Sequence, residues 1–228
     1  MLVLFAGIGG WCEKLDLSGW DVVSIENDPA IAECYADRYP NHTVIVGDAM
    51  AYLRDNWKTY QGKENIIQAS PPCQTHSRLR YQLGVRNKKN SKAKEHEFID
   101  PMLIQLLIFM MTLPSNNPPT WIIENVNPYY DRFVRFAPLF LRKIGRHYVW
   151  TNADIPLLIP PPPKSNKISP NRGIKNIDYY SIKRVKDDTG FDLSNWPKIK
   201  NKRQVLRNMF EPELSEYLFN LITKGLKK

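Results

Sequence analysis

The chain has 228 residues, of which 43% are hydrophobic and 11% aromatic, so it is long enough to form one α/β domain with a buried core. It has no run of 18 apolar residues and no signal-peptide pattern at its start, which predicts an intracellular protein, cytoplasmic or nucleoid-associated, without a transmembrane helix. The net charge of +9 arises after residue 60, because residues 1–60 are net acidic. Such a basic excess is expected of a protein that binds a polyanion, although a lysine-rich solvated surface gives the same count.

Short β-branched runs alternate with helical patterns through the first two-thirds of the chain. The predicted strands are residues 2–5, 21–26, 43–46, 65–69, 120–124 and 147–150. The predicted helices lie near residues 11–18, 28–38, 49–58, 100–113 and 129–143, and an amphipathic helix closes the chain at 213–226. This alternation predicts an α/β fold with a doubly wound, mainly parallel sheet of the Rossmann-like type, in which ligands bind at the carboxyl ends of the strands.

Two segments interrupt this alternation. Residues 75–99 are polar and strongly basic, and they predict a long loop of the kind that is usually functional or disordered. Residues 156–202 begin with a proline run and form either a small irregular subdomain or a linker. We therefore divide the chain into a main domain at 1–155, a small basic region at 156–202 and a returning C-terminal part at 203–228.

A glycine cluster, Gly7-Ile8-Gly9-Gly10, follows the first predicted strand and allows the backbone to approach a ligand closely. Glu26 ends the second strand, where a carboxylate can bind ribose hydroxyls, and Asp48 follows the third, where it can accept from an adenine amino group. A glycine turn alone is more often a tight turn than a cofactor site. With the two acids it favours an adenosine-type cofactor, and the absence of the third glycine of a Gly-x-Gly-x-x-Gly turn argues against a nicotinamide oxidoreductase.

The three cysteines differ in their surroundings. Their odd number and spacing fit neither a disulfide framework nor a zinc site, so no metal is expected, and Cys12 and Cys34 are interpreted as buried apolar fillers. Cys73 follows Pro71-Pro72, which fixes its backbone, and precedes the basic loop, which suits a reactive thiolate. For a cysteine taken alone, however, a partly buried thiol in a rigid turn is the more common role. Glu124, at the end of an apolar strand, is either functional or the cap of a following helix.

The strings LFAGIGG, SPPCQ and ENV, in this order and on these strands, resemble the cofactor, nucleophile and acid motifs of the cytosine-5 DNA methyltransferases. Near the C-terminus, RNMFEP before a helix resembles the last cofactor-contacting motif of that family. The resemblance runs from residue 2 to about residue 222, nearly the whole chain.

The resemblance implies S-adenosylmethionine as cofactor. Phe5, Ala6, Gly7 and Gly9 would line its pocket, with Glu26 on the ribose, Asp48 near the adenine and Asn208 near the methionine end. Cys73 would attack carbon 6 of a cytosine flipped out of the duplex, Glu124 would hydrogen-bond or protonate N3, and no metal would be needed. Nucleic acid would be bound by basic and polar residues in the two interrupting segments, namely Gln74, Arg78, Arg80, Lys88, Lys89, Arg172, Lys183 and Arg184.

Two features depart from the family pattern. The acid that usually precedes LFAG is replaced by Val3, and no Gln-x-Arg-x-Arg string, which holds the flipped cytosine's carbonyl, is present. Arg146 is the nearest replacement, followed by Arg78 and Arg80. The region at 156–202 is small for a target-recognition domain, which predicts a short target site.

These observations predict a compact, monomeric methyltransferase that modifies carbon 5 of cytosine in double-stranded DNA and does not bind membranes. An RNA substrate, or a catalytically silent relative that only binds nucleic acid, remain as alternatives.

Overall fold

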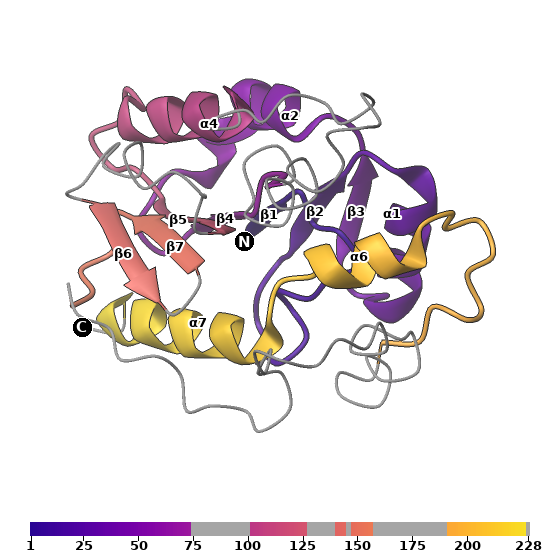
Figure 1. Ribbon diagram of the computed structural model, residues 1–228. Coiled ribbons are helices and arrows are strands. Elements are labelled where there is room, and N and C mark those ends of the chain that lie inside the picture. The colour runs from indigo at the N-terminus through magenta and orange to yellow at the C-terminus, as the bar shows by residue number, and fades with distance from the viewer. Residues whose placement is uncertain (74–100, 127–139, 145–146, 157–190, 227–228) are drawn as a thin grey trace, which may run out of the picture. The chain divides into compact units, whose positions relative to one another are not determined.

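The structure is a computed structural model, and it describes residues 1–73, 101–126, 140–144, 147–156 and 191–226 (Figure 1). The chain divides into two units, one made of Met1, Val3–Tyr52 and Pro161–Lys228, and one made of Leu2 and Leu53–Pro160. No helix among the described residues is long and apolar enough to cross a bilayer.

The first unit is built on strands β1 (Leu2–Leu4), β2 (Val23–Glu26) and β3 (Thr43–Val46), which lie in the order β3-β2-β1. Strands β2 and β3 are parallel, with Glu26 opposite Val46. Helix α1 (Pro29–Arg38) follows β2 and packs on β2 and β3 (Figure 1). Its N-cap residue is Asp28, whose side chain accepts hydrogen bonds from the backbone N–H groups of Ala30 and Ile31 and so satisfies donors of the first turn. Helix α2 (Ala49–Asn56) follows β3.

The C-terminal segment of the chain belongs to the same unit. It contributes α6 (Lys202–Asn208) and α7 (Pro212–Leu226). Leu214, Leu218 and Ile222, spaced four residues apart on α7, are all buried. A second apolar cluster joins the glycine-turn residue Ile8 and the α1 residue Cys34 to the residues Phe191, Leu193, Ile199 and Leu206.

The second unit contains four strands, which lie in the order β4-β5-β7-β6. These are β4 (Ile66–Ala69), β5 (Thr120–Val126), β7 (His147–Thr151) and β6 (Leu141–Ile144), accompanied by the short 3-10 helix η1 (Trp57–Tyr60) and by α4 (Pro101–Met111). Strand β5 is parallel to β4 and antiparallel to β7, which is in turn antiparallel to β6. Residues 120–125 of β5 are all buried, as expected for a central strand between two neighbours.

The α/β class is confirmed, and each of the six predicted strands is present within two residues of its expected ends. The helix predicted near residues 11–18 is wrong, because this stretch forms turns and irregular backbone. The Asp16 carboxylate accepts from the backbone N–H and the hydroxyl of Ser18, which gives the backbone an alternative to helical hydrogen bonds.

The helix predicted near residues 129–143 is also wrong where it can be compared, because residues 141–144 form strand β6. Pairing with β7, which lies later in the chain, determines this conformation. The helices predicted near 28–38, 49–58, 100–113 and 213–226 are confirmed as α1, α2, α4 and α7.

We predict that Leu218→Ala lowers the free energy of unfolding by about 2–5 kcal/mol, because Leu218 is completely buried and its truncation leaves a cavity. Urea denaturation followed by circular dichroism measures this loss. The control is Asn220→Ala on the exposed side of the same helix, which should change stability by less than about 0.5 kcal/mol. Equal losses in the two variants would show that the face of α7 that carries Leu218 does not contribute to the core as described.

Candidate active site

The turn after β1 has an unusual backbone. Phe5, Gly7 and Gly9 have positive φ angles of 57°, 56° and 88°, and Phe5 is the one described residue other than glycine with such an angle. A phenylalanine in this conformation is strained, and such strain persists only where surrounding contacts impose it. A Cβ added at Gly7 would meet no atom within 4 Å, so space is open beside this peptide.

One group that holds this turn is Glu26, which is buried at the end of β2 with 8% of its surface exposed. The backbone N–H of Gly7 donates to Glu26 Oε2 at 2.9 Å, and the N–H of Asp28 donates to Oε1 at 3.0 Å. Each carboxylate oxygen can accept a further hydrogen bond. Glu26 therefore fixes the glycine turn and can still receive hydroxyl groups of a ligand.

Close packing explains the other two glycines. A Cβ at Gly9 would lie 2.3 Å from the Tyr39 ring, and a Cβ at Gly10 would lie 2.3 Å from Met209 and 2.6 Å from the Phe210 carbonyl oxygen. The segment after α6 thus packs directly on the glycine turn. Asn208, the last residue of α6, is exposed beside this contact.

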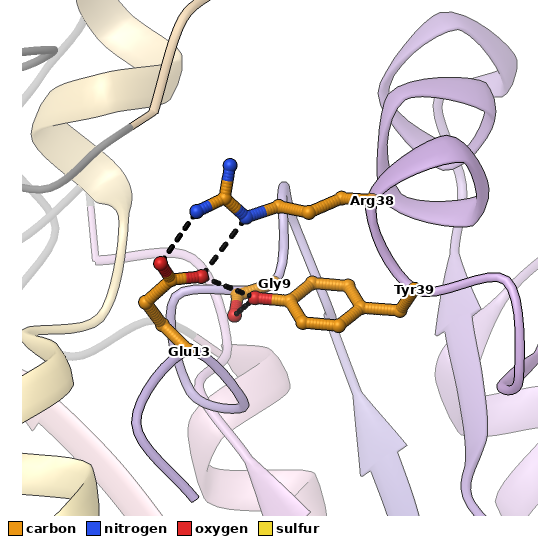
Figure 2. Close-up of polar contacts among 4 residues, drawn as sticks. All are labelled: Gly9, Glu13, Arg38 and Tyr39. Carbon is orange, nitrogen blue, oxygen red and sulfur yellow. Dashed lines mark hydrogen bonds and ion pairs between the residues drawn. The ribbon is translucent and has the colours of Figure 1, made fainter.

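Three polar side chains, those of Glu13, Arg38 and Tyr39, form a hydrogen-bonded group next to Gly9 (Figure 2). Arg38 makes a two-pronged ion pair with Glu13, in which Nε donates to Oε2 at 2.9 Å and Nη2 donates to Oε1. The Tyr39 hydroxyl donates to the Gly9 carbonyl oxygen at 3.0 Å and lies 2.7 Å from Glu13 Oε2. Burial, reinforced by Glu13, raises the pKa of the Tyr39 phenol, so it remains a hydrogen-bond donor. Glu13, Arg38 and Tyr39, which we call the turn clamp, thereby link the end of α1 to the glycine turn.

Asp48 is exposed at the start of α2, where its Oδ1 accepts from the N–H of Ala51 at 2.7 Å. The preceding residue, Gly47, donates its N–H to the Glu26 carbonyl oxygen at 3.0 Å. Glu26 ends β2 and Asp48 follows β3, and these two strands are parallel neighbours in the sheet. The sequence had predicted the two acids at the ends of successive strands.

In the second unit, Cys73 follows β4 and is half-exposed. The Asn125 side chain on β5 donates from Nδ2 to the Pro71 carbonyl oxygen at 3.0 Å, in a buried hydrogen bond. This bond holds the Pro71-Pro72 turn that carries Cys73 against β5. Asn125 was not singled out from the sequence, and its position inside the ENV string was the only available signal.

Glu124, the residue before Asn125, is buried and bound to a histidine. Its Oε1 lies 2.6 Å from His147 Nδ1, and the side chains of both residues are only 10% exposed. The antiparallel register pairs His147 with Val126 and Val149 with Glu124, so Glu124 and His147 are diagonal neighbours on one face of the sheet. His147 was predicted only as part of a strand.

The remaining predicted site residues lie outside the described residues. They are Arg146 and the predicted nucleic-acid-binding residues Gln74, Arg78, Arg80, Lys88, Lys89, Arg172, Lys183 and Arg184. Among the described residues, no group of three or more His, Cys, Asp or Glu side chains is arranged to hold a metal ion.

The sequence matches the family profile described as C-5 cytosine-specific DNA methylase over residues 1–129. The chain belongs to this family. Members transfer a methyl group to carbon 5 of cytosine, with S-adenosylmethionine as the methyl donor. Comparison with curated proteins gives no sequence match.

Among solved structures, Spodoptera frugiperda DNMT2 is similar, with 14% identity and a TM-score of 0.56 over 97% of this chain and 98% of that one. This likeness is one of fold. A putative DNA modification methyltransferase from an E. coli prophage has 22% identity and a TM-score of 0.35, over 56% of this chain and 32% of that chain. An RNA methyltransferase from Salinibacter ruber, solved with S-adenosyl-L-homocysteine, has 15% identity and a TM-score of 0.36, over 70% of this chain and 82% of that chain. These last two TM-scores are too low to support an inference about this chain.

The buried state of Cys12 and Cys34 is confirmed, and burial raises the pKa of the Cys12 thiol to about 12 and that of the Cys34 thiol to about 11. At pH 8 only about one Cys34 thiol in a thousand is ionised, and fewer at Cys12.

We predict that iodoacetamide at pH 8 modifies Cys73 first, as followed by peptide mass spectrometry. Cys73→Ala should abolish the fast phase, and fast labelling of Cys34 in the folded protein would contradict the prediction.

We also predict that Tyr39→Phe weakens the binding of S-adenosylmethionine by about 3- to 10-fold, because the Gly9 carbonyl loses one of its hydrogen bonds and the glycine turn is held less firmly. Isothermal titration calorimetry measures the affinity. Tyr217→Phe on α7 is the matched control and should leave it unchanged. An affinity unaltered by Tyr39→Phe would show that the turn keeps its conformation without the clamp hydroxyl.

Proposed function

We propose that this chain methylates carbon 5 of cytosine in double-stranded DNA through a covalent adduct on Cys73. The observation that carries the proposal is the arrangement at the ends of β4 and β5. These strands are parallel, with Ala69 opposite Ile123. The segment that leads to Cys73 begins after Ala69, and Glu124 comes directly after Ile123, so both start from neighbouring positions in the sheet. A hydrogen bond from Asn125 to Pro71 joins the two strand ends. A nucleophile and a carboxyl group held in this way suit attack on a polarised ring.

The first unit fits the cofactor. The positive φ angles at Phe5 and Gly7, the open space beside Gly7 and the buried Glu26 carboxylate make a turn that a nucleoside can approach. We assign the ribose hydroxyls to Glu26 and the adenine amino group to Asp48. Ala6, Gly9 and Asn208 would complete the pocket on the side of the methionine moiety. When bound, S-adenosylmethionine supplies an electrophilic methyl group on a sulfonium sulfur.

The residues of the second unit supply the remaining chemistry. The Cys73 thiolate attacks carbon 6 of cytosine, and the electrons of the carbon 5–carbon 6 double bond move to carbon 5 as Glu124 hydrogen-bonds or protonates N3. Carbon 5 becomes nucleophilic in this adduct and accepts the methyl group. Loss of the carbon 5 proton to solvent or a base then re-forms the double bond, expels the Cys73 thiolate and returns the proton from N3.

Duplex DNA is the proposed substrate because the matched family is described as a DNA methylase and because the chain carries a net charge of +9. Carbons 5 and 6 are inaccessible in a stacked helix, so the cytosine must be flipped out, at a cost of a few kcal/mol. Contacts to phosphates from the predicted basic residues, and Arg146 as a replacement for the absent arginine motif, remain predictions.

The proposal predicts a covalent complex with DNA that contains 5-fluorocytosine. Fluorine on carbon 5 cannot leave as a proton does, so the adduct cannot eliminate Cys73 and is trapped after methyl transfer. The enzyme is incubated with S-adenosylmethionine and either a random-sequence duplex DNA or a structured RNA containing this base, and adducts are separated on a denaturing gel. We expect an adduct with DNA in the wild type and none in Cys73→Ser.

Transfer of label from methyl-labelled S-adenosylmethionine to ordinary DNA and RNA is measured beside it. Adduct and label in RNA alone would overturn the choice of substrate but keep the chemistry. If neither the adduct nor the label is found in DNA or in RNA, while S-adenosylmethionine still binds, the proposed activity is overturned. That result would favour a catalytically silent relative that binds nucleic acid.

A further inference from the structure

We propose that His147 is a positioning residue for the reaction, one that orients the Glu124 carboxyl group toward the cytosine ring. This inference rests on the proposed function. Its basis is the buried 2.6 Å contact between His147 Nδ1 and Glu124 Oε1. Two heteroatoms this close in a buried site must share a proton, so the pair is a strong hydrogen bond.

The contact restricts Glu124 to one useful geometry. Glu124 lies on β5 and His147 on β7, and the sheet register fixes both backbones, so the histidine ring can hold the carboxyl group without movement of either strand. Oε1 is occupied by His147, whereas Oε2 makes no hydrogen bond to any of the described residues. Oε2 is therefore the oxygen that would meet the base, either as an O–H donor to N3 or as an acceptor from the cytosine amino group.

Without His147 the same carboxyl group would be buried with an unsatisfied oxygen. Rotation of the Glu124 side chain would then relieve the cost of burial, but it would disturb the geometry needed for catalysis. The expected consequence is slower chemistry with unchanged cofactor binding, since neither Glu124 nor His147 is among the residues proposed to bind the cofactor.

The test uses two substitutions of nearly equal shape. His147→Asn places an amide donor close to the position of Nδ1, and His147→Leu has the same outline without a donor. We expect His147→Leu to lower kcat for methyl transfer by roughly 10- to 100-fold, the range for loss of a hydrogen bond to a charged group. His147→Asn should recover most of this loss, and the KM for S-adenosylmethionine should stay within about twofold of the wild type in both variants.

A double-mutant cycle separates positioning from a general effect on folding. In a Glu124→Gln background, His147→Leu should lower kcat by less than about threefold, because the carboxyl group that it orients is already absent. A loss equal to that seen in the wild-type background would show that His147 acts only on the structure and would overturn the proposal. Equal activity of His147→Leu and wild type would overturn it as well.

If His147→Leu does not fold, the ring nitrogens of His147 are followed by NMR in the wild type and in Glu124→Gln, with His147→Asn used to assign the signal among the four histidines. A changed Nδ1 signal, with near wild-type kcat in His147→Asn, supports the proposal, and an unchanged signal overturns it. A wild-type enzyme that methylates neither DNA nor RNA would instead overturn the proposed function, and this inference with it.

Discussion

The buried carboxylate of Glu26 is the constraint on which the first unit depends. A carboxylate that leaves water requires hydrogen-bond donors, and here the donors are the backbone N–H groups of Gly7 and Asp28. One bond sets the strained turn after β1, and the other sets the residue that begins α1. The turn clamp holds the opposite side through the Gly9 carbonyl (Figure 2). The turn is thus shaped before any ligand arrives, so little conformational entropy need be lost on binding.

The second unit obtains the same kind of rigidity with neutral groups. A proline pair restricts the backbone before Cys73, and the Asn125 amide binds the Pro71 carbonyl oxygen in the interior. A neutral amide costs less to bury than a charge, and it leaves the charge of this site to Glu124, which is bound by His147. The ENV string therefore combines two tasks on adjacent residues: Asn125 holds the nucleophile's turn, and Glu124 faces the substrate in the proposed mechanism.

The features that could be predicted from the sequence are those encoded locally. The glycine turn, Glu26, Asp48 and Cys73 each lie at the end of a predicted strand or within a few residues of it, so a strand end and its functional residue are read from one short window. Glu124 could be placed in the same way. The His147–Glu124 bond spans 23 residues and the Asn125–Pro71 bond spans 54, and both depend on strand pairing that no local pattern reveals. The same reason explains strand β6, whose conformation is determined by β7.

Among the described residues, the partner of the Glu124 carboxyl group is a histidine. A guanidinium beside a carboxylate can donate up to two parallel hydrogen bonds and keeps the carboxylate charged, because arginine does not lose its proton. Histidine donates one bond from Nδ1 and can exchange its proton near neutral pH, so it can pair with either form of a carboxyl group. A carboxyl group that must sometimes donate to N3 benefits from a partner that does not require it to stay ionised. A histidine beside Glu124 is therefore compatible with catalysis. The role of the absent arginine motif, which is to bind the cytosine carbonyl, is left to another group, for which Arg146, the neighbour of His147 in the sequence, is the proposed candidate.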